Sequence, residues 1–109
     1  MKLEGIPFIV TDWSTVERTE HPGERGTAWW KTRHFGEVRV RFVEYSAGYL
    51  ADHWCKKGHV VLVVSGELET ELEDGRVMTL AAGSSYQVAD GEPAHRSSTA
   101  FGATLFIVD

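Results

Sequence analysis

Residues 51–76 read ADHWCKKGHVVLVVSGELETELEDGR and carry the clearest structural pattern in the chain. Positions 67, 69, 71 and 73 are glutamates, and the positions between them are leucine, threonine and leucine. A period of two is typical of a β-strand, because successive side chains point to opposite faces. The Asp74-Gly75 pair that follows favours a tight hairpin turn, in which the backbone needs positive φ angles. We therefore predict a β-hairpin in which residues 76–80 return beside Leu72.

The run just before this hairpin, from His59 to Ser65, is apolar at nearly every position. A short run that is apolar on both faces is typical of a strand buried on both sides. We therefore expect this strand to lie inside a sandwich or barrel.

The segment from Gly36 to Ser46 alternates in the same way as the hairpin, with Arg39 and Arg41 set between valines and a phenylalanine. An alternating strand buries one of its two faces. We expect the apolar side chains to face the core and both arginines to form surface pairs. The alternative is that the arginines face a cavity and bind the carboxylate of a substrate.

The rest of the chain also favours short strands joined by turns. Residues Tyr86 to Val88 and Thr104 to Val108 are predicted strands, with turns at 82–84 and 90–93. Residues 11–28 are the least regular part and have room for a short helical turn after Ser14. No segment keeps a helical period over several turns. The prediction is an all-β sandwich or closed barrel, formed as a single domain by residues 1–109.

The overall charge and composition exclude several classes of partner. A net charge of −5 argues against nucleic acid and anionic membranes, because both need a basic face. The longest aliphatic run, Val60 to Val64, is too short to cross a bilayer, and the first residues lack a signal-peptide pattern. Cys55 is the single cysteine, which excludes an internal disulfide. We expect a soluble, cytoplasmic protein.

Four side chains in the central and C-terminal parts are candidate metal ligands: His53, Cys55, His59 and His95. His53 and Cys55 are two residues apart and share a face if the segment is extended. Imidazole and thiolate suit a borderline transition metal such as zinc, iron, nickel or copper. Magnesium and calcium prefer oxygen ligands and fit poorly. We predict one divalent transition metal per chain, with Cys55 as the fourth ligand or as a close neighbour.

From about Gly48 onward these elements resemble the two signature motifs of the cupin superfamily. The first motif has a histidine, a second histidine two later, a glutamate four after that, and a glycine seven beyond. Its places here hold His53, Cys55, His59 and Gly66, so two ligand identities differ but both replacements can bind metal. The places of the second motif hold Gly83, Ala89, Gly91 and His95, with alanine for proline and one extra residue before the histidine.

The resemblance implies a double-stranded β-helix, or jelly-roll, barrel that carries a metal and forms a homodimer. Cupins include dioxygenases, isomerases, binding proteins and regulators. The chain also resembles the small single-domain cupins named for an Asp-His-Cys-Trp motif, since it reads Asp52-His53-Trp54-Cys55. That resemblance implies no particular activity.

Three functions are consistent with these observations. If three histidines bind the metal and Cys55 stands off, open positions remain for a small-molecule substrate, as in an oxygenase or isomerase. If all four side chains bind, the closed site favours a non-catalytic metal-binding or small-ligand-sensing module. The third possibility is a metal-free structural cupin.

Aromatic residues suggest a cavity and a subunit contact. Four tryptophans exceed what so small a core needs, and tryptophan is enriched at interfaces. The apolar segment Ile6 to Val10 also indicates a subunit contact, and we predict a homodimer. The candidate cavity-lining or interface residues are Tyr49, Trp54 and Tyr86, followed by Trp29 and Trp30.

Overall fold

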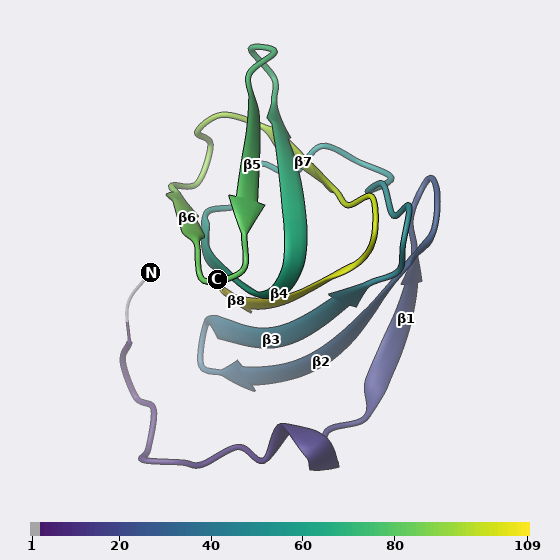
Figure 1. Ribbon diagram of the computed structural model, residues 1–109. Coiled ribbons are helices and arrows are strands. Elements are labelled where there is room, and N and C mark those ends of the chain that lie inside the picture. Colours follow the sequence, from purple (N-terminus) through teal and green to yellow (C-terminus); the bar gives the residue numbers. More distant parts are fainter. Residues whose placement is uncertain (1–2) are drawn as a thin grey trace.

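The computed structural model describes residues 3–109, in which eight strands and one short 3-10 helix are arranged as a barrel (Figure 1). The elements are η1 (Trp13–Thr15), β1 (Arg18–Pro22), β2 (Thr27–Phe35), β3 (Val38–Tyr45), β4 (His59–Leu72), β5 (Val77–Ala81), β6 (Ser85–Val88), β7 (His95–Ser98) and β8 (Ala103–Val108). The predicted all-β architecture is confirmed. The predicted helical turn after Ser14 corresponds to η1.

The strands pair antiparallel throughout, and β4 belongs to both walls of the barrel. One wall has the order β1-β2-β3-β8-β4, and β6 pairs with β4 beyond it. The other wall is formed by the second half of β4 with β5 on one side and β7 on the other. Figure 1 shows β4 bending from the lower wall into the upper one.

The bend in β4 depends on a close backbone approach at Gly66. The pairing of β4 with β8 shifts register between Val63 and Ser65, and Gly66 has a φ of 78°. A Cβ atom at Gly66 would lie 2.2 Å from the carbonyl oxygen of Gly102. Only glycine meets both demands, because it tolerates positive φ and has no side chain to collide.

The predicted hairpin is present in the predicted register. The backbone N–H of Leu72 donates to the carbonyl of Arg76 at 2.8 Å, and Gly75 has a φ of 94°. Asp74 accepts a hydrogen bond from the backbone N–H of Arg76 at 3.0 Å. The leucine and threonine side chains face inward and the glutamates face solvent, as the alternation requires.

Two expectations about strands are wrong. The strand from His59 is buried on one face only, since Val60, Leu62 and Val64 are 40%, 38% and 45% exposed. These side chains point outward from the wall, and no second layer of the described chain covers them. Residues 11–28 are also more regular than expected, because they contain β1 and the start of β2.

The core lies between the two walls and is built from alternate residues of β3, β4 and β8. Its largest fully buried side chains are Val43, Val61, Val63, Leu68 and Leu105. Within residues 3–109, the structure contains no helix with the length and apolar character needed to span a membrane.

Candidate metal site and cavity

Three of the four predicted ligands meet at one end of the barrel interior: Cys55, His59 and His95. Cys55 precedes β4, His59 is the first residue of β4 and His95 is the first residue of β7. The backbones of Cys55 and His95 exchange two hydrogen bonds, with N···O distances of 2.8 and 3.0 Å. Such a pair places both side chains on the same face. One ligand atom from each residue lies within 4.8 Å of the others.

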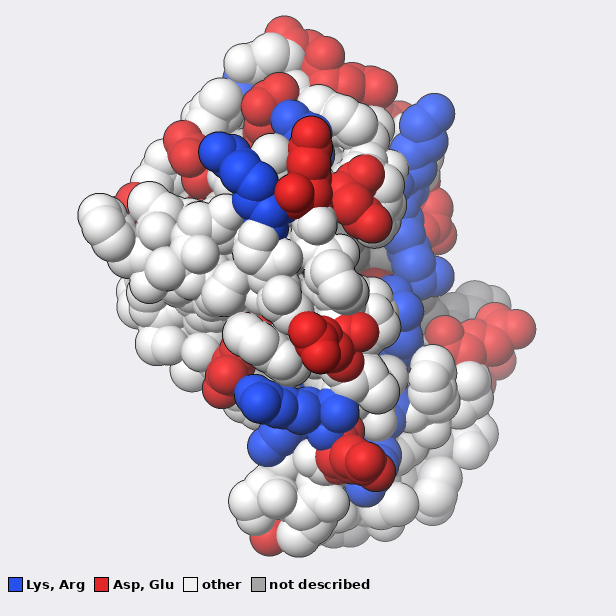
Figure 2. All heavy atoms as spheres, turned by 90° about the vertical axis from the view of Figure 1, so that its right-hand side faces the viewer, with Lys and Arg blue, Asp and Glu red and all other residues white. Residues whose placement is uncertain are grey.

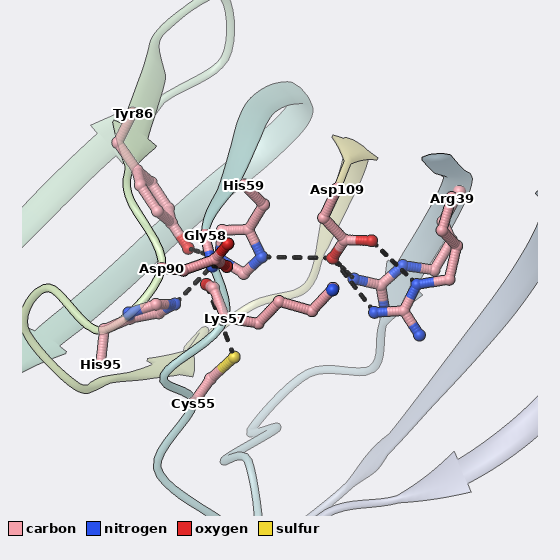
Figure 3. Close-up of polar contacts among 10 residues, drawn as sticks. Arg39, Cys55, Lys57, Gly58, His59, Tyr86, Asp90, His95 and Asp109 are labelled. Atoms are coloured by element: carbon pink, nitrogen blue, oxygen red, sulfur yellow. Dashed lines mark hydrogen bonds and ion pairs between the residues drawn. The ribbon is translucent and has the colours of Figure 1, made fainter. Parts of the chain in front are cut away.

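The two imidazoles face each other through their Nε2 atoms, which are 2.9 Å apart (Figure 3). Their Nδ1 atoms already have acceptors. Nδ1 of His95 lies 3.1 Å from the carbonyl oxygen of Pro93, and Nδ1 of His59 lies 3.4 Å from a carboxylate oxygen of Asp109. A carbonyl and a carboxylate can only accept, so each Nδ1 carries a proton.

Neutral imidazoles in this tautomer present bare lone pairs at Nε2. Two lone pairs at 2.9 Å require a cation between or beside them, either a proton or a metal ion. The separation suits two ligands of one ion, because zinc–nitrogen bonds are about 2.0–2.1 Å long. The hydroxyl of Tyr86 lies 3.1 Å from Nε2 of His59 and points into the same space.

The thiol of Cys55 is suited to ligation as well. The hydrogen bond with His95 lowers the pKa of Cys55, an effect that burial opposes. The same hydrogen bond raises the pKa of His95. The half-buried sulfur lies 4.0 Å from the carbonyl oxygen of Lys57. Each shift favours the charged form of its group relative to an isolated cysteine or histidine.

His53 is not brought into this cluster. Its side chain is 71% exposed, and its Nδ1 lies 2.6 Å from a carboxylate oxygen of the adjacent Asp52. The segment around Asp52 and His53 bends instead of continuing as an extended strand. The two-residue spacing therefore does not place His53 and Cys55 on one face.

The expected position of the two β3 arginines is wrong. Arg41 is 6% exposed, and Arg39 and Arg41 both line the barrel interior. Val40 and Phe42 occupy the outer face of β3, with Phe42 against Trp13 of η1. The outer face of this wall is itself largely apolar, so the rule that the apolar face points inward fails here.

Asp109, to which no sequence pattern points, links the arginines to the histidine pair. Its carboxylate accepts from Arg39 at 2.9 and 3.1 Å and from Arg41 at 3.0 Å, and it faces Nδ1 of His59 (Figure 3). Burial alone would raise the pKa of Asp109. The hydrogen bonds from His59 and Arg39 and the charges of both arginines outweigh burial and hold that pKa well below its ordinary value. A lone aspartate after an apolar strand carries no recognisable motif.

These groups line a cavity of about 120 Å³ inside the barrel. Tyr49, Tyr86 and Trp30 line it. Burial raises the pKa of both tyrosines, so their hydroxyls stay protonated. Trp54 is 40% exposed with the guanidinium of Arg96 over its ring, and it does not line the cavity.

The remaining aromatic candidate, Trp29, lies outside the cavity. Trp29 lies under the guanidinium of Arg18 on the outer face, with 5.0 Å from its ring centroid to Cζ. His21 stacks on Trp30 with 3.7 Å between ring centroids.

On the face in Figure 2, lysine and arginine atoms form a band from top to bottom, with acidic groups on both sides of it.

Comparison with solved structures identifies the architecture. A predicted oxalate decarboxylase from Thermotoga maritima superposes with a TM-score of 0.78 at 13% identity, over 92% of this chain and 96% of that one. An RmlC-like cupin from Shewanella frigidimarina gives 0.72 at 20% identity, over 94% and 90%. A sugar phosphate isomerase of the cupin superfamily from Silicibacter pomeroyi gives 0.73 at 18% identity, over 92% and 74%. The chain has the cupin fold. No family model matches it, and no curated protein matches its sequence.

Within this cupin barrel the Cys55, His59 and His95 cluster fits a transition metal. One sulfur and two imidazole nitrogens form a donor set for zinc, iron, nickel or copper. The partners of the two Nδ1 atoms supply the outer hydrogen bonds that orient metal-binding histidines in proteins. The predicted cupin architecture is confirmed, and the metal remains a prediction.

Proposed function

We propose that this protein is a metal-dependent cupin that acts on a small molecule, as an oxygenase or an isomerase. Cys55, His59 and His95 would hold one divalent transition metal. The observation that carries the proposal is the 2.9 Å separation of the two Nε2 atoms, each presented by an imidazole whose Nδ1 is already bound. Such a pair of lone pairs is a preformed cation site.

Three protein ligands leave room for a reactant. A four-coordinate metal with three protein ligands keeps an open position, where it polarises a bound oxygen or lowers the pKa of a bound water. The cavity borders the cluster, so a substrate in it would lie beside Cys55, His59 and His95. The protonated hydroxyl of Tyr86, 3.1 Å from Nε2 of His59, can donate a hydrogen bond to that substrate.

Known chemistry in this fold supports the proposal at the level of small-molecule substrates. The similar structures include an isomerase and a predicted decarboxylase, and an ectoine synthase from P. lautus superposes with a TM-score of 0.71 at 19% identity over 93% of this chain and 76% of that one. At such identities the likeness concerns the fold, and the reaction must be argued from the site.

Elemental analysis of protein purified without a histidine tag tests the metal site. We expect about one transition-metal ion per chain, and loss of most of it in His59→Ala and His95→Ala. His53→Ala is the matched control, because its exposed side chain lies outside the cluster and should leave the metal content unchanged. Wild-type protein without metal after incubation with zinc, iron, nickel and copper salts would refute the site.

A second function is a non-catalytic metal or small-ligand sensor. The small cavity favours it, since about 120 Å³ is well below the roughly 300–1,000 Å³ of typical ligand pockets. Turnover distinguishes the two functions. Metal-loaded protein that binds small ligands without converting them under aerobic or anaerobic conditions would support the sensor.

We also propose that the chain forms a homodimer through the outer face of β4. Val60, Leu62 and Val64 form an apolar row there, and the extended segment before η1 exposes Phe8 and Val10 at 98% and 80%. Two such apolar surfaces on one small molecule are typical of a subunit contact. The cytoplasmic location stays a prediction.

A further inference from the structure

The barrel interior carries more positive than negative charge. Among the described residues that line the cavity, the cations are Arg39, Arg41 and Arg96, and Asp109 is the single acidic residue. Arg96 pairs with Glu24 at 3.4 Å and lies over Trp54, towards the surface. The inner group therefore consists of two guanidinium groups that share one carboxylate, with an excess of one positive charge.

The carboxylate of Asp109 accepts from both arginines, but it does not bond Nε of Arg41. One of its oxygens accepts from Nε of Arg39. The other accepts from Arg39 and Arg41 and also faces His59. Nε of Arg41 has no hydrogen-bond partner among the described residues, and Arg41 is buried, with 6% exposure. A buried donor without a partner is costly, and more so on a charged group.

The guanidinium of Arg41 cannot avoid the cost of this unpartnered donor by losing its proton. Burial and the neighbouring charge of Arg39 lower the pKa of Arg41, but a guanidinium stays charged in proteins. Its Cζ atom lies 4.4 Å from the ring centroid of Trp30, which fixes the plane of the group. Arg41 and Trp30 both line the cavity, and a guanidinium held in this way suits a carboxylate.

We propose that the cavity binds a small carboxylate, with its charged end on Arg41 and the rest of the molecule directed towards the Cys55, His59 and His95 cluster. The direction of the ligand towards a metal site rests on the proposed function. The binding of an anion at Arg41 does not depend on it. The cavity volume of about 120 Å³ limits the ligand to a few heavy atoms. Apolar side chains of Val61, Leu105 and Ile107 form the remaining wall and favour a compact organic acid over a hydrated inorganic ion.

Acetate is the test ligand and acetamide is its neutral counterpart of the same shape. Both are titrated by nuclear magnetic resonance into chelator-treated protein and into protein loaded with zinc. We expect acetate to shift resonances of Trp30 and Tyr45 at millimolar concentration in both forms, and acetamide to bind at least tenfold more weakly. Absence of acetate binding in both forms would overturn the inference.

Three variants separate the cavity from general attraction to positive charge. Arg41→Met should weaken acetate binding at least tenfold, whereas Arg33→Met removes the same charge from an exposed position on β2 and should leave it unchanged. Asp109→Asn removes the competing negative charge and should tighten acetate binding several-fold in chelator-treated protein. Loss of acetate binding in Arg41→Met could also come from poor folding of that variant. Poor folding cannot produce the gain in affinity expected of Asp109→Asn, so the two variants together distinguish a lost ligand contact from a lost fold. Equal effects of Arg41→Met and Arg33→Met, or no gain in Asp109→Asn, would overturn the inference.

A bulky acid, 4-tert-butylbenzoate, tests whether the anion enters the barrel. We expect no binding, and binding as strong as that of acetate would place the anion on the surface and overturn the inference. The two proposals fail separately. If zinc does not bind, acetate titration of the chelator-treated protein still tests whether the cavity binds an anion. If zinc binds but acetate does not, only the anion inference fails.

Discussion

Nδ1 of His59 faces the carboxylate of Asp109 at 3.4 Å, across a distance of fifty residues in the sequence. The carboxylate holds the imidazole in the tautomer that leaves Nε2 free, and it places a negative charge behind the proposed metal ligand. Asp109 would therefore act on a bound metal through His59, and not by direct contact.

Asp109→Asn should lower metal affinity by about 10–100-fold while leaving the ligand set intact. The amide of asparagine keeps the shape but loses the charge that makes His59 a better donor. Competition with a chromophoric chelator measures the affinity. Glu44→Gln, an exposed carboxylate on the outer face of β3, is the control and should behave like wild type. Wild-type affinity in Asp109→Asn would show that the carboxylate serves only the arginines.

Cys55→Ser tests whether the sulfur binds the metal. With Cys55 as a ligand, cobalt-loaded wild-type protein should show a sulfur-to-cobalt charge-transfer band in the near ultraviolet, and the variant should lack it. We expect the variant to bind metal more weakly, because a serine hydroxyl is a poor substitute for a thiolate. An unchanged spectrum and affinity would leave His59 and His95 as the ligands and Cys55 as a neighbour.

Metal affinity should fall as the solution becomes more acidic. His95 must be neutral and Cys55 ionised to bind, so each ion displaces protons from the metal-free protein. The hydrogen bond with Cys55 raises the pKa of His95 above its ordinary 6.5, so proton competition begins at a higher pH than for an isolated histidine. We expect a loss of about tenfold per pH unit for each displaced proton below that pKa. Zinc titrations between pH 5 and 8 check this, because that range extends about 1.5 units on either side of an ordinary histidine pKa. A flat profile would contradict it.

Gly75→Val should destabilise the protein by about 1–3 kcal/mol, because a β-branched residue resists the positive φ of 94° that this turn uses. Gly75→Asn should cost less, since asparagine tolerates the left-handed region better. No atom of residues 3–109 would lie within 4 Å of a Cβ at Gly75, so the difference isolates backbone conformation from packing. Urea unfolding gives the two free energies, and equal values would mean that φ is not the cause.

Leu62→Lys should shift the protein from dimer to monomer if the outer face of β4 is the subunit contact. A buried lysine in the centre of an apolar row opposes association. Val77→Lys is the control, since Val77 is 51% exposed on the hairpin away from that row. Sedimentation equilibrium at micromolar protein should give twice the 12.2 kDa chain mass for wild type and control. Wild-type protein at the monomer mass would end the proposal.

The local patterns in the chain predicted the local structure well. The alternation of glutamates with Leu68, Thr70 and Leu72 and the glycine of the turn determined both the faces and the register of the hairpin, because each needs only neighbouring residues. The spacing of Cys55, His59 and His95 likewise found three side chains that the barrel brings together.

The errors arose where the outcome depended on distant parts of the chain. His53 lies outside the ligand cluster, because the segment around it bends and its ring is hydrogen-bonded to Asp52. The predicted position of Arg41 was wrong because its partner, Asp109, follows β8 and is 68 residues away in the sequence. Alternation alone cannot tell which face of a strand is enclosed. Both faces of β3 contain apolar residues in the structure.

The position of β8 between β3 and β4 has a consequence for the order of folding. Asp109 exchanges backbone hydrogen bonds with Arg39, and their side chains are bonded across seventy residues. Hairpins such as β4–β5 close short loops and form early, whereas insertion of β8 must wait for two strands from distant parts of the chain. His59 acquires its Asp109 partner only at that late step. A metal ion would thus bind tightly only at the last step of folding, and local fraying of β8 would limit the rate at which the bound ion dissociates.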